Sequence, residues 1–180
     1  FQSMIQLTDY QISEIVSLEI QWKLKIGNWT LHDRMTRHIP VLLDESISAL
    51  DLHKGDTVVD VTLGGGGHTR AMLGRVLPGG RVIASDADAF AVERFIRHAE
   101  ADPILRKAVE DGSLSVIRRN FSDIGSMLAE VGIADVRAVF ADFGFSSDQV
   151  DDPERGFSFL MDGPLDMRLD RERPETAADV

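Results

Sequence analysis

The residues with the clearest chemical meaning are four consecutive glycines and two acids that follow apolar runs. Gly64–Gly67 lie between the apolar run Thr57–Val59 and His68, with Asp60 at the head of the loop. Because glycine has no Cβ, another molecule can approach the backbone of such a turn closely. Asp86 ends the next apolar run along the chain. A glycine-rich turn after one strand, with an acid at the end of the next, is typical of α/β sheets that bind a nucleoside cofactor through its ribose hydroxyls.

The spacing of the glycines argues against a dinucleotide. A dinucleotide fingerprint needs glycine at its first, third and sixth positions, and counting from Gly64 the sixth position is Thr69. A nicotinamide-dependent dehydrogenase is therefore disfavoured. Asp60 instead suits S-adenosylmethionine, whose amino and sulfonium groups carry positive charge. A tight turn without a ligand is the simpler alternative, and the paired acid Asp86 is what argues against it.

Composition indicates one soluble globular domain. The chain has 180 residues, 43% of them hydrophobic, and contains no apolar run near the roughly 20 residues of a membrane helix. Cysteine is absent, which excludes disulfides, thiolate catalysis and Cys-ligated zinc. The five histidines lack the spacing of a metal-binding helix, so we expect no metal.

The net charge of −11 is concentrated in the second part of the chain. Residues 1–40 hold four basic and four acidic side chains, whereas Asp142–Val180 holds eleven acids and four arginines. An acidic surface repels phosphate, which argues against nucleic-acid binding by this stretch alone. We expect its arginines to form internal ion pairs; they are Arg155, Arg168, Arg171 and Arg173.

The first 37 residues are expected to stand apart from the domain. Phe1–Met4 has the form of a protease-site remnant followed by an initiator methionine. Val16–Ile26 alternates apolar and polar residues, which predicts an added amphipathic strand that ends at Gly27-Asn28.

The remaining chain predicts a Rossmann-like, doubly wound, mainly parallel α/β sheet. Right-handed crossovers give the strand order third, second, first, fourth. After Phe143 no strand pattern follows, so the sheet is expected to be truncated after its fourth core strand. The expected strands are Thr57–Leu63, Arg81–Ser85, Leu114–Arg118 and Arg137–Phe143, and the expected helices are Val41–Leu50, Thr69–Leu77, Ala89–Ala99 and Ile124–Val131.

Four separated blocks resemble one family. They are His38–Glu45, Asp60–His68, Asp142–Gln149, and Pro153–Phe159 with Asp162–Asp170 after it. Together they are similar to the MraW/RsmH methyltransferases, which modify the exocyclic amine of a cytosine in small-subunit ribosomal RNA. The resemblance runs from His38 to Val180 and leaves the first 37 residues unmatched. The chain departs from the family where Asp-Leu-Gly-Val/Cys-Ser-Ser becomes Asp142-Phe-Gly-Phe-Ser-Ser.

The resemblance implies S-adenosylmethionine as cofactor and ribosomal RNA, or the small ribosomal subunit, as partner. It implies that residues 38–180 are the N-terminal part of the methyltransferase domain, without the family's helical insert and closing strands. A bacterial cytoplasmic location follows, or an organellar one in a eukaryote; a homodimer is left open. The implied cofactor-binding residues are Gly66, Gly67, His68, Asp86 at the ribose, Phe121 at the adenine, Asp142 and Gln149.

Asp142, at the end of the fourth expected strand, and Phe145, just after it, are candidates for catalysis. Asp142 and Phe145 occupy the first and fourth positions of the Asp-Pro-Pro-Tyr/Phe unit found in other amine methyltransferases. We hypothesise that Asp142 lies near the amine and that Phe145 stacks on the flipped cytosine. The alternative is that Asp142 contacts only the cofactor and that Phe145 belongs to the core. Asp142-Phe143-Gly144 also matches a kinase tripeptide, but no other kinase motif accompanies it.

Three functions therefore remain open for the chain. The first is an rRNA cytosine methyltransferase, and the second is a catalytically incompetent cofactor-binding fragment or scaffold of the same fold. The third is a nicotinamide-dependent dehydrogenase, which Thr69 disfavours because a dinucleotide fingerprint needs glycine at that position.

Overall fold

The computed structural model describes residues 40–180. The expected tag remnant and the predicted strand Val16–Ile26 lie outside the described residues. The expectations for them stay predictions.

A sheet of four parallel strands forms the centre of the molecule, in the order β3-β2-β1-β4. This is the predicted order. The strands are β1 (Thr57–Asp60), β2 (Arg81–Asp86), β3 (Leu114–Arg118) and β4 (Ala138–Phe140).

β1 and β4 are shorter than predicted because the chain turns at their carboxyl ends. The Thr62 N–H donates to Asp60 Oδ1 at 3.0 Å, which bends the backbone immediately after β1. One backbone hydrogen bond nevertheless links the two stretches of chain beyond the ends of β1 and β4, since the Val61 N–H donates to the Phe140 carbonyl at 3.0 Å. The ends of these two strands therefore stay side by side where the glycine-rich loop begins.

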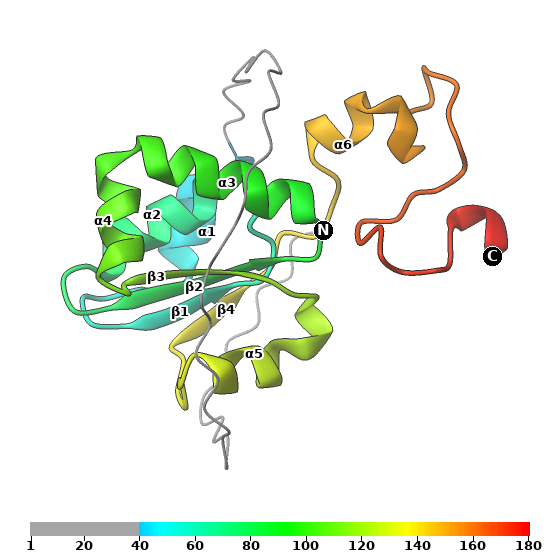
Figure 1. Cartoon of the computed structure of the whole chain (residues 1–180). Helices are drawn as coiled ribbons and strands as arrows, with labels where there is room; N and C mark the ends of the chain where they lie inside the picture. The colour runs from blue at the N-terminus through cyan, green and yellow to red at the C-terminus, as the bar shows by residue number, and fades with distance from the viewer. Residues whose placement is uncertain (1–39) are drawn as a thin grey trace.

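Helices cover both faces of the sheet (Figure 1). Alternate strand residues face opposite sides: Val58 and Val82 pack in the core beneath most of the helices, while Val59 and Ile83 pack in the core against α5. The helices are α1 (Leu43–Ala49), α2 (Gly67–Val76), α3 (Ala89–Ala101) and α4 (Pro103–Glu110) on one face and α5 (Ile124–Glu130) on the other.

Helix α4 was not predicted from the sequence. α3 ends and α4 begins at the same residue, Asp102, whose side chain accepts from the N–H groups of Ile104 and Leu105. Pro103 stands at the first position of α4, where its missing N–H has no cost. The two helices are thus separated by a single capping residue.

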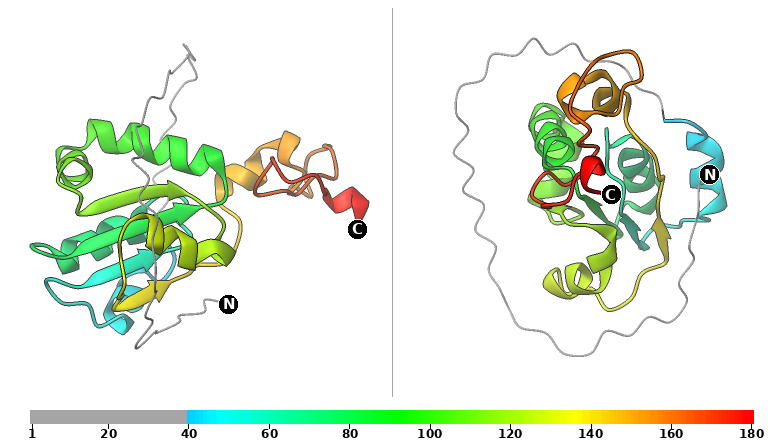
Figure 2. Two further views of the ribbon diagram at one scale, coloured as in Figure 1. Left: turned by 60° about the horizontal axis from the view of Figure 1, so that its bottom comes forward. Right: turned by 90° about the vertical axis from the view of Figure 1, so that its right-hand side faces the viewer.

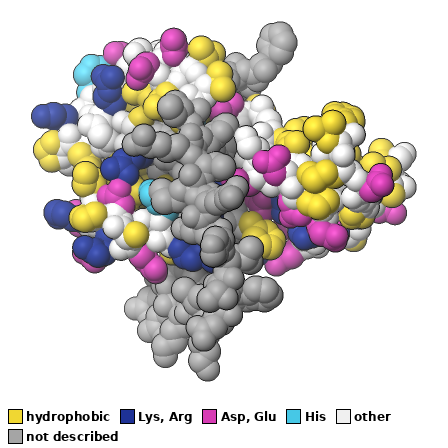
Figure 3. All heavy atoms as spheres, turned by 90° about the horizontal axis from the view of Figure 1, so that it is seen from above, with side chains coloured by type: hydrophobic (Ala, Val, Ile, Leu, Met, Phe, Trp, Pro, Cys, Tyr) yellow, Lys and Arg dark blue, Asp and Glu magenta, His cyan; other side chains and the backbone are white. Residues whose placement is uncertain are grey.

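The segment after β4 lies beyond the carboxyl ends of the strands (Figure 2). It contains α6 (Ser147–Asp151) and two short 3₁₀ turns, Pro153–Arg155 and Ala177–Asp179. In agreement with the prediction, the described chain has no strand after Phe140. Acidic and hydrophobic side chains gather on the face of this segment that Figure 3 shows, and Phe159 and Leu160 are almost completely exposed.

Among residues 40–180, no helix combines the length and the apolar character that crossing a membrane requires.

Candidate functional site

The acid at the end of β2 is bonded to the glycine loop. Asp86 Oδ2 accepts from the Gly64 N–H at 2.8 Å, and Oδ1 accepts from the Asp88 N–H at 2.9 Å. Burial raises the pKa of the Asp86 carboxyl above its usual value, against the effect of these hydrogen bonds. Since each carboxylate oxygen has two acceptor sites, both oxygens can still accept from a ligand hydroxyl.

The four glycines differ in what surrounds them. A Cβ on Gly66 would lie 2.1 Å from the Phe95 ring, and a Cβ on Gly67 would lie 2.3 Å from Pro40. A Cβ on Gly65 would meet nothing within 4 Å, and Gly65 is exposed. The inner glycines are therefore required by packing within the protein, whereas the loop is open at Gly65. The cofactor contacts assigned to Gly66 and Gly67 stay predictions, and nothing in the sequence distinguishes Gly65 from these two glycines.

His68 lies in the first turn of α2 and is buried against Phe140, with ring centroids 4.5 Å apart. Burial lowers the pKa of His68, and the nearby Asp142 carboxylate opposes that shift. Its Nε2 has no hydrogen-bond partner among the described residues. Because buried polar atoms are nearly always paired, this nitrogen suits a polar group of a bound ligand.

Asp60 anchors the loop from below. It is fully buried, and its Oδ2 accepts from the Thr69 hydroxyl at 2.6 Å. Burial is the largest influence and raises the pKa of Asp60 to about 6, although the hydrogen bonds from Thr69 and Thr62 oppose it. The acid thus ties the start of α2 to the end of β1.

Asp60 should make stability fall as the pH rises through the mildly acidic range. Its pKa is about 6 in the folded chain against an ordinary 3.8, so the folded state binds the proton more tightly. The stabilisation from this proton is complete below pH 3.8 and is lost as the pH rises to about 6. A shift of this size corresponds to about 3 kcal/mol.

Urea unfolding of wild type and Asp60→Asn at pH 4 and pH 7 measures this effect. The free energy of unfolding of the variant, relative to wild type, should rise between the two pH values. Asp135→Asn removes an exposed acid and serves as the matched control. An unchanged difference for Asp60→Asn at both pH values would contradict the assignment.

Asp142 follows β4 and meets the loop after β1. Its N–H donates to Thr62 Oγ1 at 2.8 Å, and its carboxylate accepts no hydrogen bond from the described part of the chain. Phe143 then packs edge-to-face on Phe121, with ring centroids 5.2 Å apart, and both rings are about half exposed. Sequence reasoning named Phe121 but missed Phe143; the signal was the aromatic residue where the family has leucine.

Gln149 and Phe145 lie farther along this segment. Gln149 Nε2 donates to Asp88 Oδ2 at 2.8 Å, and its Oε1 accepts from the Ser146 N–H at 3.0 Å. Both ends of the amide are therefore bound within the protein. Phe145 is 58% exposed, and its ring centroid lies 4.5 Å from that of the buried Phe157. The structure brings Gly64, Asp86, His68 and Asp142 to one edge of the sheet, and it places Gln149 against Asp88 instead.

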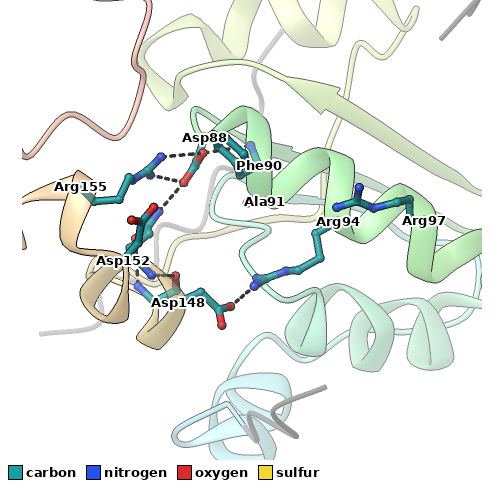
Figure 4. Close-up of a pocket in the computed structure, with 10 residues that line it drawn as sticks. Asp88, Phe90, Ala91, Arg94, Arg97, Asp148, Asp152 and Arg155 are labelled. Carbon is teal, nitrogen blue, oxygen red and sulfur yellow. Dashed lines mark hydrogen bonds and ion pairs between the residues drawn. The ribbon is translucent and has the colours of Figure 1, made fainter. Parts of the chain in front are cut away.

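A hollow of about 280 Å³ lies between α3 and the segment around α6 (Figure 4). Gln149 alone among the predicted site residues lines it, so the hollow is separate from the glycine loop. Of the four arginines expected to form internal ion pairs, Arg155 pairs with Asp88 and Arg168 with Asp166, whereas Arg171 donates to the backbone carbonyl of Glu154. Residues 40–180 contain no cluster of His, Asp and Glu side chains suited to a metal.

The comparison with known families decides the classification. Residues 35–180 match the model of the MraW methylase family. The chain belongs to the MraW methylase family. This membership confirms the predicted family, and S-adenosylmethionine rather than a dinucleotide is the cofactor that agrees with it.

Similar proteins come from bacteria. The chain is 45% identical over 143 residues to the ribosomal RNA small subunit methyltransferase H of Burkholderia vietnamiensis and, to the same extent, to that of Burkholderia ambifaria. Both alignments cover 79% of this chain and 42% of the relative, so the chain spans about two fifths of these relatives' length. A SAM-dependent O-methyltransferase from Thermotoga maritima is 20% identical, with a TM-score of 0.40 over 49% of this chain and 32% of its own.

Proposed function

We propose that the protein binds S-adenosylmethionine and transfers its methyl group to the exocyclic amine of a cytosine in small-subunit ribosomal RNA. The observation that carries this proposal is the bond between Asp86 and the Gly64 N–H, because it joins the two parts of a nucleoside-binding site in a member of a methylase family. The relatives' names support the ribosomal substrate. The choice of cytosine rests on the resemblance to the MraW/RsmH enzymes.

The residues at the edge of the sheet fit this cofactor. The Asp86 carboxylate has free acceptor sites for ribose hydroxyls, and the open backbone at Gly65 permits close approach. The exposed rings of Phe121 and Phe143 offer apolar surface for an adenine. His68 Nε2 is a buried nitrogen without a partner. When bound, S-adenosylmethionine supplies an electrophilic methyl group on sulfur.

The chain's own contribution to the reaction is to hold the amine and accept its proton. The lone pair of a cytosine amine is delocalised into the ring, which makes the nitrogen a poor nucleophile. A carboxylate that accepts from the amine N–H favours localisation of that lone pair. The Asp142 carboxylate suits this role because no described residue donates a hydrogen bond to it. Phe145 presents an exposed ring on which the base can stack.

We also propose that residues 38–180 are the N-terminal part of the methyltransferase domain. The greater length of the relatives supports this, and it makes a catalytically incompetent cofactor-binding fragment the second candidate for the chain by itself. Cytoplasmic action on the small ribosomal subunit fits the whole protein.

Two measurements test the proposal. Titration calorimetry of the chain should show binding of S-adenosylmethionine and none of NAD. The full-length protein should transfer labelled methyl groups to small ribosomal subunits, while the chain alone distinguishes the enzyme from the incompetent fragment. Absence of donor binding, or binding of NAD instead, would contradict the assignment.

Asp142→Asn should separate donor binding from methyl transfer. The amide keeps the shape of the side chain and leaves the backbone bond to Thr62 in place. If Asp142 accepts from the amine, we expect donor affinity within about threefold of wild type and a turnover lowered by about 100-fold or more. Donor affinity is measured by calorimetry and turnover by methyl transfer in the full-length protein. Loss of donor binding would show instead that Asp142 serves the cofactor.

A further inference from the structure

Asp88 is a buried acid that the proposed reaction does not use. Its side chain is about 4% exposed and forms an ion pair with Arg155, whose side chain is 3% exposed. Asp88 Oδ2 accepts from Arg155 Nη2 and from Gln149 Nε2, and Oδ1 accepts from the Phe90 N–H at 3.0 Å. Figure 4 shows Arg155 reaching Asp88 from the segment after β4. A charge pair so thoroughly removed from water is costly to form and costly to break on one side only.

Asp88 also contacts the proposed ribose acid directly. Its N–H donates to Asp86 Oδ1 at 2.9 Å. One residue is therefore bonded through its backbone to the cofactor side of the site and through its side chain to Arg155. The proposed methyl transfer does not itself require a buried charge at this position.

The ion pair between Asp88 and Arg155 holds the segment 145–157, which carries Phe145, the ring proposed to stack on the cytosine. Arg155 lies in the turn Pro153–Arg155. Along the sequence this turn falls between Phe145 and Phe157, whose rings pack on each other. Gln149, which shares the Asp88 carboxylate, also closes the capping box of α6 through Ser146. The contacts of Gln149 and Arg155 thus attach residues 145–157 at two points to Asp88, the N-cap of α3.

We propose that Asp88 and Arg155 are positioning residues for methyl transfer. Their buried ion pair fixes the position of residues 145–157, which carry Phe145, relative to Asp86. This inference rests on the proposed function. It requires that loss of the pair misplace Phe145 while Asp86 and the glycine loop keep their geometry. Displacement of a reacting group by about 1 Å can cost about 100-fold in rate.

A second ion pair joins the same two elements and provides the matched control. Arg94 of α3 pairs with Asp148 of α6, but these side chains are 40% and 49% exposed. Exposed pairs contribute little because water and salt screen them. Arg94→Met should therefore change little where Arg155→Met changes much.

The test uses the full-length protein and three variants: Arg155→Met, Arg155→Lys and Arg94→Met. For Arg155→Met we expect kcat to fall by about 100-fold, with the KM for S-adenosylmethionine within about threefold of wild type. Amide hydrogen exchange of residues 145–157 should accelerate, while that of β1 and β2 stays unchanged. Arg155→Lys keeps the charge and should recover part of kcat, and added guanidinium ion should restore part of the activity of Arg155→Met.

Each outcome bears on a separate claim. Inactivity of the wild-type protein would end the proposed function, while hydrogen exchange would still decide whether the pair fixes the segment. Unchanged exchange in residues 145–157, or faster exchange with unchanged kcat, would overturn the positioning role. A loss of donor affinity equal to the loss of kcat would also overturn it. If Arg155→Met does not fold, Arg155→Lys carries the test through its kcat, its KM and the same exchange measurement.

Discussion

Asp86→Ala should weaken S-adenosylmethionine binding by about 100-fold while leaving the chain folded. A hydrogen bond to a charged group contributes about 1.5–3 kcal/mol, and the ribose offers two hydroxyls to this carboxylate. Loss of about 3 kcal/mol corresponds to about 100-fold in the dissociation constant. The free energy of unfolding should fall less, because Asp86 is only partly buried at the carboxyl end of β2. Calorimetry measures the affinity, and urea unfolding measures the stability.

The pH dependence gives a second, independent signature of Asp86. Burial raises the pKa of this carboxyl, so it gains a proton at a higher pH than an exposed aspartate does. Ligand hydroxyls donate to the ionised form, and affinity should therefore be greatest above the raised pKa and fall as the pH drops through it. Asp86→Ala should remove this dependence. Asp162→Ala, which removes an exposed acid, should keep both the affinity and its pH profile.

Equal pH profiles in wild type and Asp86→Ala would contradict a role for Asp86 at the ribose. Full affinity in the variant would place the nucleoside elsewhere. Either result would also contradict the nucleoside-binding role of Asp86 on which the proposed function rests.

The strand order, which local sequence pattern determines, was predicted correctly. The apolar runs and right-handed crossovers determine the strand order, and this order places Asp86 beside the loop after β1. The bond from the Gly64 N–H to Asp86 follows from that adjacency, since the carboxyl ends of neighbouring parallel strands meet at one edge. The same pattern did not predict α4, which begins one capping residue after the end of α3.

Contacts between residues that are far apart in the sequence could not be predicted from local sequence pattern. Asp88 and Arg155 are 67 residues apart, and the sequence showed only an acid near the ribose residue and an arginine in an acidic segment. Gly66 and Phe95 show the same limit, because a glycine in a loop and a phenylalanine in a helix give no sign that they touch. The four glycines look alike in sequence and differ only through what the fold places beside each one.

Gly66→Ala should destabilise the chain strongly. Gly66 has φ +78, which side chains rarely adopt, and an added Cβ would lie 2.1 Å from the Phe95 ring. The backbone strain costs about 1–2 kcal/mol. Overpacking in a well-filled core costs about a further 1–3 kcal/mol. A total near 3 kcal/mol should lower Tm by roughly 10 °C in a domain of this size.

Gly65→Ala is the matched control in the same loop. No atom lies within 4 Å of its added Cβ, and its φ is outside the left-handed region. Its Tm should therefore stay close to wild type, with a change in stability of less than about 0.5 kcal/mol. Binding of S-adenosylmethionine should nevertheless weaken, because the new methyl group stands on the open side of the turn. Thermal unfolding should therefore show a lowered Tm for Gly66→Ala and an unchanged Tm for Gly65→Ala. Calorimetry should show that Gly65→Ala weakens donor binding although the chain stays stable.

A double-mutant cycle with Phe95→Ala identifies the cause of the Gly66→Ala defect. Phe95 is buried, so its truncation alone costs about 3–5 kcal/mol. In that background the ring is gone, and Gly66→Ala should then cost only the backbone strain of about 1–2 kcal/mol. The two substitutions should therefore be less than additive. Strict additivity would mean that the added methyl group and the ring do not compete for the same space, and would contradict this cause of the defect.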